Sequence, residues 1–303
     1  MKTLTESKYE KTVAFLHHDA RPLEQTLFAY HFEGASGAAA LQELANFQNS
    51  DGGFGHGLEP DIRLTDSSVI ATTIAFQRLR DLNIVADNPI VAKACRYLVD
   101  TYDSRNLNWP IIPPNIDDAP HAPWWVRGGD LEMSRSNPRA EIVGYLNQYA
   151  KNFPQAMREN VTQSVIDHLM SQPDEMEMHD LLCYIRLWET PNLPEDTKSR
   201  LLQKLKRIVD NTVERKPEAW RNYGLPPLTV IASPESPFAD SFRAEIQQNL
   251  DFLMENQSEE GTWGPNWSWG DQWPQAWEQA KRDWTGYLTL ENLRKLRTFG
   301  RIE

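Results

Sequence analysis

The densest cluster of chemically capable side chains lies in a proline-rich stretch after residue 110. It contains two adjacent acids, a histidine and two tryptophans: Asp117, Asp118, His121, Trp124 and Trp125. Neighbouring carboxyl groups repel each other's charge, so one of them can keep a proton and act as a general acid. The face of an indole ring can stabilise a cation. The stretch therefore predicts acid-initiated chemistry, with both aspartates and the histidine as catalytic groups and both indoles on the substrate.

A second cluster contains His56, Glu59 and Asp61. A related stretch near the C-terminus, residues 264–270, has no acid and no histidine at the matching positions, so the turn itself does not require them. We predict that Glu59 and Asp61 are further catalytic groups and that His56 contacts substrate. The alternative is that the two acids cap helices or pair with Arg63.

A third cluster is aromatic and consists of tryptophans between residues 263 and 284: Trp263, Trp267, Trp269, Trp273, Trp277 and Trp284. We expect the first and last of these to pack in the core. Trp267, Trp269 and Trp273 are predicted to bind a polyene, a cation or the faces of sugars. The alternative is a tryptophan-rich lid that closes one end of a barrel.

The loops that carry the second and third clusters share one sequence pattern. Gln48 and Gln257 are each followed by an acid at +3, Gly at +4, an aromatic at +6 and Gly at +7, with leucines at −7 and −4. The aromatics are Phe54 and Trp263. Such a loop suggests a Gln amide at a helix end, glycine at a tight turn and an aromatic side chain covering the turn. Internal repetition of this kind decides architecture.

The similarity continues into the helices that follow, which we expect to begin at Asp66 and Asp283. They align without a gap, and the matched positions are Thr72 with Thr289, Phe76 with Leu293, Leu79 with Leu296 and Arg80 with Arg297. This unit of helix, loop and returning helix resembles the repeat of the terpenoid cyclase and protein prenyltransferase superfamily. The Gln-x-x-x-Gly-x-Trp form of the second copy is similar to the QW motif of that superfamily.

The resemblance implies an all-α fold, an α/α toroid of helical hairpins with long loops rich in Trp, Gly and Pro. We expect one domain over residues 1–303, with inner helices around an axial cavity. In the resembling family the repeat motifs are scaffold, which implies packing roles for four residues: Gln48, Phe54, Gln257 and Trp263. Three long loops are expected to carry the function: residues 50–66, 107–137 and 257–282.

Residues 115–119 are similar to the Asp-x-Asp-Asp-Thr-Ala acid motif of squalene-type and class II cyclases. Asn115 stands where that motif has its first acid, and Ala119 stands where it has Thr. The chain has room for one toroid, whereas squalene-type enzymes have two. The catalytic zinc of the prenyltransferase branch, held by Asp, Cys and His, has no match here, so we predict no metal and no cofactor. A zinc site built from His56, His121 and carboxylates remains an alternative.

Helical periodicity predicts most of the remaining structure. Apolar residues step by three or four along three segments: Val161, Val165 and Leu169; Leu201, Leu205, Ile208 and Thr212; and Phe242, Ile246, Leu250 and Leu253. Strand-like alternation is scarce. Start signals at Asn137-Pro138 and Pro194, and a stop signal at Gly300, agree with about a dozen helices.

Composition narrows the function classes. The net charge of −12 disfavours nucleic-acid binding and electrostatic membrane docking. No apolar run is long enough to span a bilayer and the N-terminal residues contain no apolar signal segment, so we expect no transmembrane segment and a cytoplasmic protein. Cys95 and Cys183 are expected to be reduced and buried.

We therefore predict a terpenoid cyclase-like or prenyltransferase-like protein that binds a hydrophobic, isoprenoid-type small molecule in an axial cavity, with acid chemistry by the paired aspartates. Two alternatives remain open. Helical toroids also carry carbohydrate hydrolases and lyases, which need two carboxylates and aromatic platforms. The chain can equally be a non-catalytic interaction scaffold. The sequence does not indicate an oligomeric state.

Overall fold

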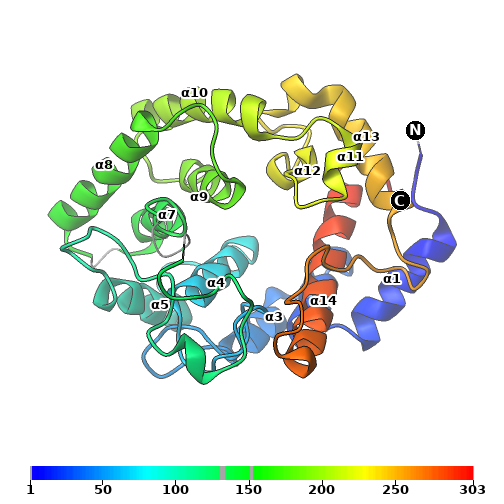
Figure 1. Cartoon of the computed structure of the whole chain (residues 1–303), viewed down its shortest axis with the longest axis horizontal. Coiled ribbons are helices and arrows are strands. Elements are labelled where there is room, and N and C mark those ends of the chain that lie inside the picture. Colours follow the sequence, from blue (N-terminus) through cyan, green and yellow to red (C-terminus); the bar gives the residue numbers. More distant parts are fainter. Residues whose placement is uncertain (1, 130–133, 151–152, 303) are drawn as a thin grey trace. The chain divides into compact units, whose positions relative to one another are not determined.

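The computed structural model describes residues 2–129, 134–150 and 153–302, and every regular element within these ranges is a helix (Figure 1). β-type pairing of the backbone occurs there only as isolated bridges, such as the one between Ile62 and His121. The predicted all-α class is confirmed.

The helices in the first half of the chain are α1 (Glu6–His18), α2 (Pro22–Phe32), α3 (Gly37–Ala45), α4 (Val69–Asp81), α5 (Pro89–Asp100), the short 3-10 helix η1 (Ile116–Asp118) and α7 (Arg139–Tyr149). Those in the second half are α8 (Gln155–Ser171), α9 (Met178–Trp188), α10 (Glu195–Thr212), α11 (Pro217–Trp220), α12 (Pro227–Val230), the 3-10 helix η2 (Ala239–Phe242), α13 (Arg243–Glu255) and α14 (Pro274–Thr298).

Apolar periodicity and capping explain where these helices form. On α8, the periodic residues Val161, Val165 and Leu169 are fully buried, as the spacing predicts. Ser68 caps α4 by accepting a hydrogen bond at its Oγ from Ala71 N at 3.1 Å. The helix predicted to begin at Asp66 thus begins three residues later.

The last helix begins earlier than the alignment of the two repeats predicted. We expected a start at Asp283, but α14 begins at Pro274, and the predicted long loop ends at Trp273 instead of Arg282. Pro274 occupies the first helical position, where its missing N–H costs nothing, and Trp273 has a left-handed φ of 49°. Gly300, with φ of 66°, follows the C-terminal end as expected.

The chain divides into two compact units: residues 1–43 with 213–303, called unit 1, and residues 44–212, called unit 2. The single domain expected over residues 1–303 stays a prediction. Within unit 2, α7 packs against α9, α8, α5 and α4. Figure 1 shows α4, α7 and α9 in one layer of this unit, with α5, α8 and α10 covering its outer side. Paired helices in two layers are therefore the plan of unit 2.

Unit 1 joins the two ends of the chain. Its α2 packs against α1 and α14, and α1 also contacts α14. The backbone N–H of Leu4 donates to Arg301 O at 2.8 Å. Arg301 is 2% exposed, and its NH1 group donates to Lys2 O at 2.6 Å and to Asp251 Oδ1 at 2.7 Å. The N-terminal helix is consequently an integral part of the C-terminal core.

The two loops with the shared sequence pattern hold their glutamines in the same way. Gln48 Nε2 donates to Gly52 O at 3.0 Å, and Gln257 Nε2 donates to Gly261 O at 3.0 Å. Both glycines have positive φ, 93° and 81°. The amides were expected to satisfy carbonyls at helix ends, but each bonds a carbonyl within its own loop. Left-handed backbone at the glycine turns the chain back on itself and lets the loop close on the amide.

The aromatic residue of each loop is fixed to the helix that follows. Phe54 N donates to Thr72 Oγ1 and Trp263 N donates to Thr289 Oγ1, each at 3.0 Å. The two threonines are the positions matched in the sequence alignment. Trp263 makes one bond that phenylalanine cannot, because its Nε1 donates to Leu253 O in the last turn of α13 at 2.9 Å. In this loop the indole, and not the Gln amide, satisfies a helix-end carbonyl.

Each loop also packs against one further helix. A Cβ added to Gly52 would lie 2.4 Å from Lys93 O on α5, and one added to Gly261 would lie 2.7 Å from Lys11 Cβ and Thr12 N on α1. In the chain α5 follows α4, whereas α1 stands at the opposite end from α14. The first loop therefore packs against α5, the helix that follows α4 in the chain. The second loop packs against α1, the first helix of the chain.

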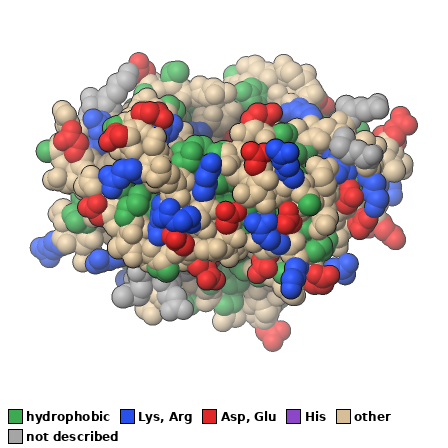
Figure 2. All heavy atoms as spheres, turned by 90° about the horizontal axis from the view of Figure 1, so that it is seen from above, with side chains coloured by type: hydrophobic (Ala, Val, Ile, Leu, Met, Phe, Trp, Pro, Cys, Tyr) green, Lys and Arg blue, Asp and Glu red, His purple; other side chains and the backbone are tan. Residues whose placement is uncertain are grey.

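No helix among the described residues is long and apolar enough to cross a membrane. On the face drawn in Figure 2, acidic and basic side chains are interspersed and are not separated into patches of one sign. The expected lack of nucleic-acid partners stays a prediction.

Candidate functional site

Backbone pairing in unit 2 brings the first two chemical clusters together. Ile62 and His121 form an antiparallel bridge. On either side of it, Arg63 N donates to Pro120 O and Ala122 N donates to Asp61 O, both at 2.9 Å. We call residues 55–63 and 115–125 the paired loops. The sequence placed both segments on long loops but did not reveal that they pair.

Burial separates the candidate acids into two kinds. Glu59 and Asp61 are 6% and 3% exposed, and His121 is 8% exposed. Asp117 and Asp118 lie on η1 and are both exposed, with 79% of the Asp117 side chain reaching solvent. The paired loops therefore bury Glu59 and Asp61, whereas Asp117 and Asp118 remain in contact with water. The acid role predicted for Asp117 and Asp118 stays a prediction.

The buried acids lie on a tightly folded turn. Asp61 N donates to Glu59 Oε1 at 3.3 Å, so the carboxyl of the first acid folds back over the backbone of the second. Gly57 has φ of 72°, and a Cβ at this position would lie 2.9 Å from Arg63 Cζ. Glycine thus lets the guanidinium of Arg63 lie directly against the turn that holds Glu59 and Asp61.

The His121 ring is oriented by its own loop. Its Nδ1 lies 2.9 Å from Ala119 O and donates to that carbonyl, which makes Nε2 the acceptor nitrogen of the neutral ring. Nε2 lies 4.0 Å from Asp117 Oδ1. A ring that is held in one tautomer, with Nε2 as its acceptor nitrogen, has the geometry for proton transfer at Nε2.

The indoles of the second loop differ in exposure. Trp125 is 6% exposed, and its backbone N–H donates to Ala122 O at 3.0 Å, which closes a turn directly after His121. Its Nε1 is buried without a hydrogen-bond partner among the described residues. Trp124 is 37% exposed. An unpaired buried indole N–H is costly, so Trp125 offers a donor that a ligand can satisfy.

The structure places His56 outside this group. The residue is exposed, has φ of 54°, and its Nε2 lies 2.9 Å from Asn49 Oδ1. It braces the glycine-rich part of the loop. Among the described residues, no group of three or more His, Cys, Asp or Glu side chains is arranged to hold a metal ion.

The third cluster belongs to unit 1. Trp269 is 1% exposed and packs on Trp277 with ring centroids 5.7 Å apart. Trp267 makes edge contacts with Trp284 at 5.2 Å and Tyr223 at 6.0 Å. Trp273 is 49% exposed. The binding roles predicted for Trp267, Trp269 and Trp273 stay predictions.

Two polar features of unit 2 were missed at the sequence level. The first is a buried network on Glu141 Oε2, which accepts from Tyr145 Oη at 2.9 Å and Gln77 Nε2 at 3.2 Å and lies 3.3 Å from Arg186 NH1. Burial raises the pKa of the neighbouring Cys183 thiol well above its usual value, which keeps the thiol protonated. These residues lie on three helices, α4, α7 and α9, so spacing along the sequence could not have signalled this network.

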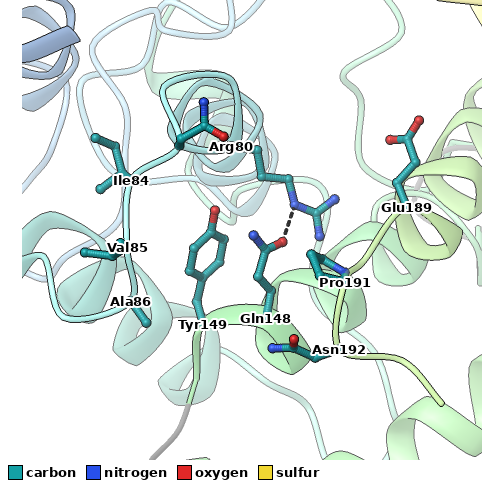
Figure 3. A pocket seen from close by; sticks show the side chains of 10 residues that line it. Arg80, Ile84, Val85, Ala86, Gln148, Tyr149, Glu189, Pro191 and Asn192 are labelled. Carbon is teal, nitrogen blue, oxygen red and sulfur yellow. Dashed lines mark hydrogen bonds between the residues drawn. The ribbon is translucent and has the colours of Figure 1, made fainter. Parts of the chain in front are cut away.

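The second missed feature is a pocket at the end of α4, α7 and α9, shown in Figure 3. Its volume is about 490 Å³, and Arg80 lies in its wall. The only signal in the sequence was that Arg80 matches Arg297 in the alignment of the two repeats. No family model, curated protein or solved structure matches this chain.

Proposed function

We propose that the chain is a terpenoid cyclase-like protein of the α/α toroid type, in which Glu59 and Asp61 supply the acid for protonation of a neutral isoprenoid. The observation that carries this proposal is the burial of both carboxyl groups beside His121 in the paired loops. Asp117 and Asp118, the acids first expected in this role, reach solvent.

The toroid is supported by the way α1 completes the second loop. In a closed ring of helical hairpins every loop packs against the next outer helix, including the loop of the last hairpin. That loop, at Gly261, packs against Lys11 and Thr12 of α1, as the loop at Gly52 packs against Lys93 of α5. An open array of hairpins would have no reason to place its first helix there.

The proposal requires one of the two buried carboxyl groups to carry a proton, because a neutral carboxyl group is the general acid that protonates an alkene. Burial withdraws both groups from water, which disfavours the ionised form of a carboxyl group.

The chemistry balances without a further reagent. A carboxyl O–H gives its proton to one alkene carbon, the π electrons form the new C–H bond, and the other carbon becomes a cation. A second alkene attacks that cation and closes a ring. Loss of a proton from the final cation to the carboxylate restores the acid, and His121 Nε2 can relay that proton. In this proposal the face of the Trp125 ring, in the adjoining turn, stabilises the cation.

A neutral substrate fits the charge of the protein better than a diphosphate. The net charge is −12, and the site itself is built on carboxyl groups. Both features repel a polyanion at long range.

The test is turnover of neutral polyenes, followed by product analysis. Glu59→Gln and Asp61→Asn should each lower the rate at least about 100-fold, the range expected for loss of a general acid. The matched control is Glu235→Gln, the same change at an exposed acid outside the paired loops, which should keep the wild-type rate. The double variant Asp117→Asn, Asp118→Asn compares the two assignments of the acid. Activity lost in that double variant but kept in Glu59→Gln and Asp61→Asn would overturn the assignment to the buried acids.

A carbohydrate-active protein is the second candidate, and two observations favour it. The pocket in Figure 3 is open and has several polar residues in its wall, including Asn83, Gln148 and Asn192. Trp273 exposes half of its surface, as a sugar-stacking platform would. A tryptophan-fluorescence titration with polyenes, prenyl diphosphates and oligosaccharides in parallel separates the two. A saturable response to oligosaccharides alone would replace the first proposal with this one, and no response to any of them would favour a scaffold.

A further inference from the structure

The pocket of unit 2 takes no part in the cyclase function proposed above. Among the described residues that line it, one has a cationic side chain. It opens where the ends of α4 and α7 meet the connection between α9 and α10. Ten residues line it: Arg80, Asn83, Ile84, Val85, Ala86, Gln148, Tyr149, Glu189, Pro191 and Asn192. A volume of about 490 Å³ is enough for a small-molecule ligand.

Arg80 is held rigidly by neutral partners. Its Nε donates to Gln148 Oε1 at 2.7 Å, its NH1 group to Arg186 O at 2.9 Å and its NH2 group to Thr190 Oγ1 at 2.9 Å. Its Cζ lies 4.4 Å from the centre of the Tyr145 ring. No carboxylate among the described residues lies within ion-pair distance of it. A partly buried cation without a counterion is unfavourable until an anion binds.

The groups beside Arg80 are hydrogen-bond donors. A guanidinium has five N–H donors, and the three bonds of Arg80 leave two of them for a ligand. Because Gln148 Oε1 accepts from Arg80, the amide NH2 of Gln148 is turned to the other side. Burial raises the pKa of Tyr149, so its hydroxyl stays protonated and can donate. Figure 3 shows the Tyr149 hydroxyl, the Gln148 amide and the Arg80 guanidinium side by side.

One wall of the same pocket is apolar. Ile84, Val85 and Ala86 lie on the turn that follows α4, and Pro191 lies on the connection opposite. Val85 is 68% exposed, the largest exposure among the large apolar side chains described. Apolar surface next to a fixed cation suits a ligand with an anionic head and an aliphatic chain.

We propose that this pocket binds a small aliphatic carboxylate, with its head on Arg80, Gln148 and Tyr149 and its chain along Ile84 and Val85. A planar guanidinium matches the geometry of a carboxylate. Phosphate suits the site less well, because Arg80 is the only cationic residue among the described residues that line it, and it would leave one charge of a dianion unbalanced.

Glu189 also lines the pocket, and its charge should lower the affinity of the pocket for an anion. Glu189 is an exposed residue, and in Figure 3 its side chain points away from Tyr149 and Gln148. Desolvation by the surrounding chain raises its pKa, and the charges of Arg186 and Arg80 oppose that rise. When ionised, this carboxylate repels an anionic ligand, so replacing it with a neutral isostere should tighten binding.

The first experiment measures binding of acetate, butyrate and hexanoate at pH 7.5 by ligand-observed NMR, with hexanamide and inorganic phosphate as comparisons. We expect affinity to rise from acetate to hexanoate by up to about fourfold per buried methylene. Hexanamide should bind at least about tenfold more weakly than hexanoate, since it lacks the charge that Arg80 pairs. Equal binding of hexanamide, or tighter binding of phosphate than of hexanoate, would overturn the proposal.

Variants locate the binding in this pocket. Arg80 links three helices, so Arg80→Gln can fail to fold, and the decisive variant is Val85→Asp on the exposed wall. It should weaken hexanoate binding at least about tenfold by charge repulsion. The matched control is Val126→Asp, the same change at a valine that is 41% exposed and does not line the pocket. Its binding should equal that of the wild type.

Glu189→Gln should have the opposite effect to Val85→Asp and strengthen hexanoate binding several-fold, because it removes a negative charge from the pocket. Wild-type affinity in both Val85→Asp and Glu189→Gln would show that hexanoate binds elsewhere. The pocket shares no residue with the paired loops, so these results are independent of the acid role proposed for Glu59 and Asp61.

Discussion

Gln257 Nε2 donates a hydrogen bond to Thr12 Oγ1 at 2.8 Å, although 245 residues separate the two in the chain. Thr12 is fully buried, and its hydroxyl also lies 2.7 Å from Gly261 O. One threonine of the first helix therefore completes the polar network of the last loop. Within unit 1, this bond links the first helix of the chain to the loop before the final helix.

Thr12→Val should lower the free energy of unfolding by about 1–3 kcal/mol, because it leaves the buried amide of Gln257 and the carbonyl of Gly261 each short of a partner. Urea denaturation followed by circular dichroism measures this. Thr26→Val is the control, since the Thr26 hydroxyl bonds only to carbonyls of its own helix at Pro22 and Leu23. Equal loss in both variants would show that the contact between α1 and the loop contributes nothing particular.

Gly52→Ala should destabilise the protein by about 2–5 kcal/mol. The change forces alanine into φ of 93° and places its Cβ 2.4 Å from the backbone oxygen of Lys93. Gly34→Ala is the matched control, because Gly34 also has positive φ, 72°, but no atom within 4 Å of the added Cβ. It should cost only about 1–2 kcal/mol. Melting temperatures of the two variants should differ clearly, and a reversed order would contradict the packing of this loop on α5.

Trp263→Phe and Trp267→Phe should differ although both replace a tryptophan in the same loop. The first removes the bond from Nε1 to Leu253 O, whereas Trp267 Nε1 is buried with no partner among the described residues. Trp263→Phe should therefore lower the free energy of unfolding by about 1–2 kcal/mol more than Trp267→Phe does. Chemical denaturation of both variants tests this, and an equal cost would argue against the hydrogen bond.

Stability should fall in alkali partly through Cys95. Burial raises the pKa of its thiol from 9.0 to about 12, so the folded state keeps a proton that the unfolded state releases above pH 9. The resulting stabilisation is complete below pH 9 and is lost as pH rises from 9 towards 12. Urea denaturation at pH 7, 9 and 10.5 should show a smaller alkaline decrease in Cys95→Ala than in the wild type. Identical pH dependence would exclude this contribution.

Local features of the fold could be predicted from the sequence because they depend on neighbours in the chain. The buried stripe of Val161, Val165 and Leu169 follows from helical spacing alone. Gly52 and Gly261 could be assigned to tight turns because a conformation with positive φ selects glycine. The start of α14 could not, because Trp273 leads into it through a left-handed backbone that no periodicity signals.

By itself the sequence determined that the chain is helical, that it carries two loops of one pattern, and which side chains could supply acid and aromatic groups. Only the tertiary structure decided which acids are buried: Ile62 pairs with His121 across a long loop, which withdraws Glu59 and Asp61 from water and leaves Asp117 in it. Likewise, Arg80 gains its environment from helices that lie far along the chain. Spacing in a sequence fixes the residues that share a helix or a turn, whereas burial and charge compensation depend on contacts between segments that spacing does not encode.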